Sequence, residues 1–191
     1  MTMRILLAVL ATVVVCGGKA AAGLLPVNVT VTPDSGNYRW TYAIVLPTDS
    51  QIRAGDFFTI YDFAGLVNGS NSQPTNWSFS TAMSGPVPAG VLPTDNASIP
   101  NLTWTYTGPT FTIGQVGLGN FWAISPYDTA TDSYFTARTH RTSDGHFDAN
   151  ITDTIVPVPS AGPPGVPEPA TLALAALGLP IVLAARRRMA R

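Results

Sequence analysis

The sequence predicts an all-β domain, an antiparallel β-sandwich or jelly-roll-like fold, over residues 24–155. Residues 24–160 contain twenty threonines but no lysine and no glutamate, which suits strand surfaces better than helix surfaces. Apolar and polar residues alternate with a period of two, and Gly-, Pro-, Asn- and Asp-containing turns separate the alternating stretches. We therefore expect two packed sheets and little helix.

Residues 38–44 form the clearest strand, because the aromatic and aliphatic residues fall on one face and polar residues on the other. Residues 102–107 alternate in the same way, and residues 57–63 are a mixed apolar run typical of a more buried strand. Shorter candidate strands are residues 27–32, 76–80, 110–116, 120–125, 134–139 and 151–156. Because large rings bury the most apolar surface, the four tryptophans are the expected core anchors. They are Trp40, Trp77, Trp104 and Trp122.

The charge of residues 24–160 excludes one class of partner. Ten aspartates stand against four scattered arginines, a net charge of −6. Such a surface offers no basic patch for a phosphate backbone, so we expect no nucleic acid as partner.

The first 22 residues have the pattern of a secretory signal peptide. Arg4 precedes an apolar stretch, residues 5–15, and Ala20 and Ala22 are the small residues that signal peptidase requires. We expect cleavage before Gly23. A lipoprotein leader is the alternative, with Cys16 as the lipidated residue, but the three valines before it are not the small residues expected there. Without the leader the chain has no thiol, hence no disulfide or cysteine chemistry.

The other end of the chain has three consecutive parts. Residues 156–169 hold six prolines and predict a semi-rigid extended linker. Residues 170–185 are apolar apart from Thr171 and predict a single short transmembrane helix. A cluster of positive charge then stays on the cytoplasmic side, which places the β-domain outside. It consists of Arg186, Arg187 and Arg188.

The order of a Pro-Glu-Pro motif, a short apolar helix and terminal arginines resembles the PEP-CTERM sorting signal over residues 166–191. The resemblance implies that Pro167, Glu168 and Pro169 are recognised by an exosortase-type membrane protease, which cleaves nearby. Residues 170–185 would be a transient membrane anchor. Residues 56–65 (DFFTIYDFAG) and 104–108 (WTYTG) resemble a recurrent domain of such proteins, to which we can attach no activity.

The same resemblance implies an exported bacterial protein that is briefly anchored in the cell-envelope membrane and then reaches the cell surface or extracellular matrix. Its partners would be signal peptidase, the exosortase and an extracellular polysaccharide, since the family is associated with polysaccharide-producing bacteria. A GPI-anchor signal is the rival interpretation of the tail, but it normally ends in apolar residues rather than arginines.

We expect no catalytic activity and no cofactor. A serine hydrolase would need a base, for which His140 and His146 are the only histidines, and no G-x-S-x-G motif is present. A metal site is an alternative for a group of residues close together in the sequence, although their spacing matches no known ligand signature. The group is His140, Asp144, His146, Asp148 and Asn150.

Two further functions remain alternatives to a non-catalytic surface protein. A carbohydrate-binding module would present exposed aromatic residues along one face, and a secreted hydrolase would hold a histidine beside an aspartate in a deep pocket. Thr-x-Thr triplets, together with a tail sometimes labelled after ice-binding proteins, raise ice binding, but the triplets are irregularly spaced and no internal repeat accompanies them.

Overall fold

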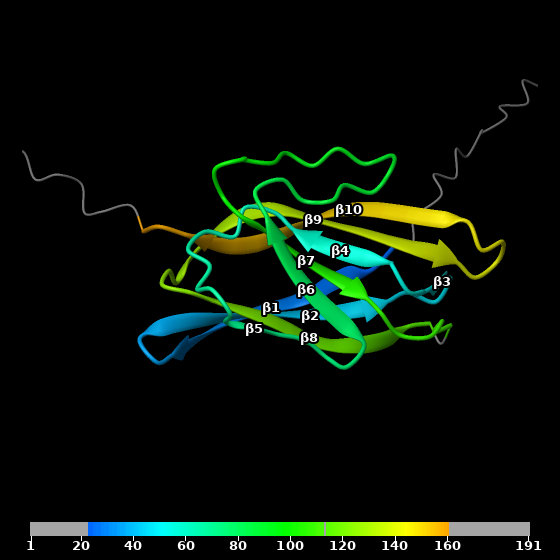
Figure 1. Ribbon diagram of the computed structural model, residues 1–191, viewed down its shortest axis with the longest axis horizontal. Helices are drawn as coiled ribbons and strands as arrows, with labels where there is room; N and C mark the ends of the chain where they lie inside the picture. The colour runs from blue at the N-terminus through cyan, green and yellow to red at the C-terminus, as the bar shows by residue number, and fades with distance from the viewer. Residues whose placement is uncertain (1–22, 113, 161–191) are drawn as a thin grey trace, which may run out of the picture.

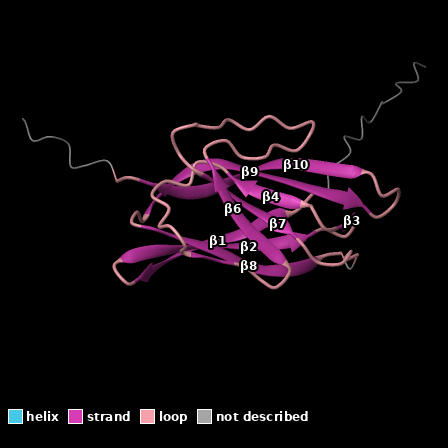
Figure 2. Cartoon of the chain, in the orientation of Figure 1, coloured by secondary structure: helices cyan, strands magenta, loops and turns pink. Residues whose placement is uncertain are grey.

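The computed structural model describes residues 23–112 and 114–160, and within these ranges the chain is all β with no helix (Figure 2). The expected signal peptide, sorting motif, transmembrane helix and arginine cluster lie outside the described residues. The ten strands are β1 (Leu25–Asp34), β2 (Asn37–Leu46), β3 (Ser50–Gln51), β4 (Phe57–Ile60), β5 (Asn71–Ser72), β6 (Trp77–Ala82), β7 (Asn101–Tyr106), β8 (Val116–Ser125), β9 (Thr129–Arg141) and β10 (Phe147–Val158).

The strands form two antiparallel sheets (Figure 1). The first sheet has the order β1-β2-β8-β5, and the second has the order β10-β9-β4-β7-β6, with the short β3 paired to β9. The arrangement is consistent with a β-sandwich. β1 begins and β10 ends at opposite ends of the molecule, shown in blue and orange in Figure 1.

An aromatic core lies between the two sheets. Phe58 of the second sheet packs edge to face against Phe121 of the first, with ring centroids 4.9 Å apart. Phe58 also stacks on Trp104 and Phe135 within its own sheet. Because such ring pairs add to the free energy of simple area burial, this cluster holds the sheets together. Trp40, Trp77 and Trp104 are buried in the core, as predicted.

The prediction that Trp122 is a fourth core anchor is wrong. In β8 the inward positions are Phe121 and Ala123, so Trp122 points to the outer face of the first sheet and is only partly buried. There the Arg39 guanidinium lies 4.4 Å from the centre of its ring. Every position from Phe121 to Ile124 is apolar or aromatic, and for this reason the sequence did not show which residues face inward.

Most predicted strands are present, but several boundaries differ. β8, β9 and β10 begin four or five residues earlier than expected, β4 ends at Ile60 instead of residue 63, and β3 and β5 were not predicted. Residues 110–116 were expected to be a strand, but Phe111 makes only an isolated bridge to Ile52. β10 continues to Val158, three residues into the expected linker. Pro157 is tolerated because β10 is an edge strand, where a missing amide donor leaves no neighbour unpaired. Its carbonyl accepts a hydrogen bond from the Ala64 amide at 3.3 Å.

The long connection between β6 and β7, residues 83–100, covers part of the outer face of the second sheet (Figure 1). The Pro86 carbonyl accepts hydrogen bonds from the hydroxyls of Thr59 and Tyr61, at 3.3 and 3.1 Å. Thr59 and Tyr61 are therefore fully buried although they face away from the core. We call residues 83–100 the covering loop.

Candidate functional site

The five residues considered as metal ligands lie around the β9–β10 hairpin, where Asp144 Oδ2 lies 3.3 Å from His146 Nδ1. His140 belongs to β9, Asp144 and His146 to the hairpin loop, and Asp148 and Asn150 to β10. Among residues 23–112 and 114–160, no group of three or more His, Cys, Asp or Glu side chains could hold a metal ion.

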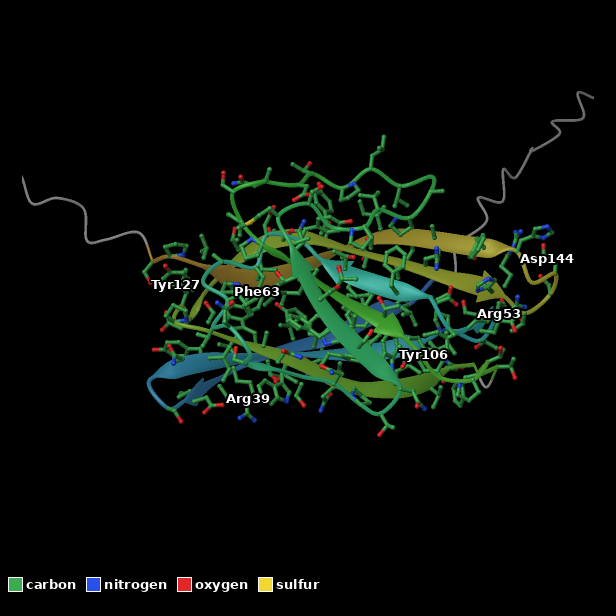
Figure 3. The ribbon with its side chains drawn as sticks, in the orientation of Figure 1. Arg39, Arg53, Phe63, Tyr106, Tyr127 and Asp144 are labelled. Atoms are coloured by element: carbon green, nitrogen blue, oxygen red, sulfur yellow. The ribbon has the colours of Figure 1, made fainter. Side chains whose placement is uncertain are left out.

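Asp144 closes the tip of this hairpin, at one end of the molecule in Figure 3. Its Oδ1 accepts a hydrogen bond from the His146 amide at 3.0 Å, and its Oδ2 lies 3.0 Å from the Arg141 guanidinium. The hydrogen bond from the His146 amide is the main cause that lowers the pKa of the exposed Asp144 carboxyl. These contacts explain Asp144 and His146 as turn-forming residues.

A buried acidic residue that the sequence analysis did not single out, Asp56, lies beside His140. Asp56 is fully buried immediately before β4, and its Oδ2 lies 2.9 Å from His140 Nδ1. The same oxygen accepts a hydrogen bond from the Arg53 amide at 2.8 Å. Arg138 Nε is 3.6 Å from the other carboxylate oxygen, Oδ1. The carboxylate therefore joins the turn before β4 to two neighbouring residues of β9.

A small cavity lies beside these residues, between the covering loop and the second sheet. It has a volume of about 230 Å³ and is lined by Phe57, Val87, Pro88, Ala89, Arg138, Phe147, Asp148 and Ala149. Neither His140 nor Asp56 lines this cavity. Instead the His140 ring packs against Phe147, with ring centroids 4.6 Å apart. A histidine beside an aspartate is thus present, but this cavity does not hold them as the hydrolase alternative requires.

Arg138 is one of the two charged residues that line this cavity, together with Asp148. Its guanidinium lies 5.0 Å from the ring centre of Phe57 and 5.1 Å from that of Phe147, and it donates a hydrogen bond to the Gly55 carbonyl. Phe147 remains 64% exposed. An exposed ring next to an arginine and the Asp148 carboxylate suits a ligand with an apolar face and several hydroxyl groups.

Asn150 connects β10 to the beginning of the described chain. Its Nδ2 donates a hydrogen bond to the Leu24 carbonyl at 2.8 Å. Its Oδ1 is buried and has no hydrogen-bond partner among the described residues. Gly23, the residue expected to follow the signal-peptidase cut, is buried against this side chain. Ala20, Ala22 and the residues of the sorting motif and arginine cluster lie outside the described ranges.

The sequence matches no protein-family model and no curated protein. Within the described ranges, the structure contains no helix long and apolar enough to cross a membrane.

Proposed function

We propose that the protein is an exported, non-catalytic bacterial surface or matrix protein whose tail is a sorting signal for an exosortase-type protease. The observation that carries the proposal is the order at the chain end: Pro167-Glu168-Pro169, the apolar residues 170–185 and three arginines. Prolines on both sides would keep Glu168 extended and separate from a following helix. Its carboxylate would then stand at the outer membrane surface, within reach of a membrane protease.

The described domain supports this division of the chain. Among the described residues, the core runs from Leu24 to Val156, within residues 24–160 that were expected to form the β-domain. β10 ends at Val158, three residues into the proline-rich stretch. We also propose that the sandwich is jelly-roll-like. In support, the consecutive strands β8 and β9 belong to different sheets.

The test compares changes in different parts of the tail, expressed in the native host. Glu168→Ala should leave membrane insertion intact and block processing, so the full-length form accumulates in the membrane. Replacing Arg186, Arg187 and Arg188 by glutamine should weaken membrane retention instead, because the charge that opposes translocation is lost. Asp153→Ala, an exposed aspartate of β10, is the control and should be processed normally. Normal processing of Glu168→Ala would refute the sorting function.

Saccharide binding is a second candidate function, favoured by the exposed Phe147 ring beside Arg138 at the mouth of the 230 Å³ cavity. A sugar ring could stack its C–H face on Phe147 and hydrogen-bond to the neighbouring charged groups. Titration with the host's purified polysaccharide, followed by calorimetry, should show about tenfold weaker binding for Phe147→Ala. Leu92→Ala removes a side chain that is 93% exposed on the covering loop and should bind like the parent. Equal affinities for parent and Phe147→Ala would exclude this site.

A further inference from the structure

Asn150 presents a hydrogen-bond acceptor in a place where the described residues supply no donor. The residue is 6% exposed, its Nδ2 is used by Leu24, and its Oδ1 is buried without a partner among the described residues. A buried carbonyl oxygen without a donor costs free energy, and native structures contain few of them. The backbone of Gly23 approaches this side chain closely.

The approach of Gly23 is so close that no side chain fits at this position. A Cβ added to Gly23 would lie 2.6 Å from Asn150 Cγ and would overlap with Oδ1. The Gly23 nitrogen is one bond of about 1.46 Å from the same Cα, so it lies within about 5 Å of Asn150 Cγ. The nitrogen is therefore near the Asn150 side chain, although Oδ1 has no hydrogen-bond partner among the described residues.

Cleavage before Gly23 changes what this nitrogen can donate. A peptide nitrogen has one hydrogen, fixed in the peptide plane. When water hydrolyses the Ala22–Gly23 bond, the carbonyl carbon of Ala22 takes the oxygen and becomes a carboxylate. The Gly23 nitrogen becomes an ammonium whose three hydrogens can rotate, one of them in the direction of the broken bond.

We propose that Asn150 is the internal binding site for the new amino terminus of Gly23, so that removal of the leader completes the hydrogen bonding of the sandwich. The proposal rests on the leader cleavage that the proposed function requires. It gives the cut a structural consequence: the mature chain is more stable than a chain that retains even one leader residue. Hydrogen bonds from a charged donor are stronger than those between neutral groups.

The first test uses chains with defined starts, prepared in the same detergent and both continuing to Arg191. A chain that starts at Gly23 should have a melting temperature about 4 °C higher than one that starts at Ala22. Asn150→Ala should abolish this difference, whereas Asn120→Ala, at an exposed position of β8, should preserve it. Equal melting temperatures of the two parent chains, or a difference that survives Asn150→Ala, would overturn the proposal.

A second test needs no substitution, so it stands even if Asn150→Ala does not fold. Lys19 is the only lysine of the sequence and lies in the leader, so Gly23 carries the only primary amine of the mature chain. An amine-acylating reagent should modify Gly23 about tenfold more slowly in the folded chain than in urea, a factor that corresponds to about 1.4 kcal/mol. Equal rates after correction for urea would contradict docking of the amine. Both chains are prepared with a defined first residue, so a negative result in these two tests does not depend on export. N-terminal sequencing of the exported protein tests leader cleavage, and hence export, separately.

Discussion

The outer faces of the two sheets are built from similar residues but lie in different surroundings. On the first sheet, Arg39 lies over Trp122 and pairs with Asp34, with 41% of the Arg39 side chain exposed. On the second sheet, Thr59 and Tyr61 face away from the core but are fully buried under the covering loop. Polar groups on the first face can exchange partners with water, whereas those on the second depend on protein partners. Equal substitutions should therefore have unequal effects.

The largest effect is expected for a tryptophan in the core compared with one on the outer face of the first sheet. Trp104→Ala should lower the free energy of unfolding by about 4 kcal/mol, because it leaves a cavity among Phe58, Phe79 and Phe121. Trp122→Ala should cost about 1 kcal/mol, since water replaces the lost contacts. Urea denaturation measures both values. Equal losses would show that the outer face of the first sheet is as tightly packed as the core.

The next largest effect compares two aspartates that pair with arginine. Asp56→Ala should cost about 3 kcal/mol, because it leaves His140, Arg138 and the Arg53 amide without their buried partner. Asp34→Ala on the first sheet should cost less than about 1 kcal/mol, as is typical of surface ion pairs. The same denaturation experiment at low and high salt should change the Asp34 value more than the Asp56 value. A small, salt-sensitive loss for Asp56→Ala would mean that this carboxylate is accessible to water.

The same difference in surroundings explains which parts of the fold the sequence predicted and which it did not. β2 was predicted closely because its alternation of polar and apolar residues reports directly on a sheet with one solvated face. The covering loop and the role of Asp56 were not predictable in this way. Asp56 acts through His140, 84 residues later in the chain, and a period-two pattern carries no information on which strands become neighbours.

Two further features were missed because they depend on partners that the sequence pattern does not show. Residues 110–116 have the composition of a strand, but composition does not tell whether a partner strand exists at that position, and Phe111 finds only Ile52. The contact between Asn150 and Leu24 joins residues 126 positions apart, so the sequence singled out Asn150 only as a candidate metal ligand in a polar loop. Its signal in the sequence was indirect: a glycine at the expected cleavage site, where the structure leaves no room for a side chain.

A smaller effect is expected for the hydroxyl that attaches the covering loop. Burial raises the pKa of the Tyr61 phenol. The phenol hydroxyl donates a hydrogen bond to the Pro86 carbonyl, and its oxygen lies 3.2 Å from Thr136 Oγ1. Tyr61→Phe should cost about 1 kcal/mol and speed amide hydrogen exchange in residues 83–100. Tyr38→Phe, at a partly buried position of the first sheet, is the matched control and should leave that exchange unchanged. Unchanged exchange in Tyr61→Phe would mean that other contacts hold the loop.

The smallest effect concerns Asp62, which joins the end of β4 to the covering loop through the Asn96 amide at 2.9 Å. Burial raises the pKa of the Asp62 carboxyl; the Asn96 hydrogen bond opposes this, and the charge of Asp95 adds to it. A carboxyl whose folded pKa is raised contributes stability that is complete below its unfolded pKa and is lost as the pH rises through the folded pKa. Ionised Asp62 therefore destabilises the fold at neutral pH.

Asp62→Asn should remove this penalty. The amide oxygen can still accept the Asn96 hydrogen bond, and asparagine tolerates the backbone angle φ of 58° at this position. Because solvent screens a partly exposed carboxyl, the gain at pH 7 should be only about 0.5 kcal/mol. The difference in unfolding free energy, variant minus parent, should grow as the pH rises above about 4. Asp144→Asn is the opposite case, because the His146 amide lowers the pKa of that carboxyl, and its difference should become more negative as the pH rises toward about 4. If both differences moved in the same direction, burial under the covering loop would not be what sets the ionisation of Asp62.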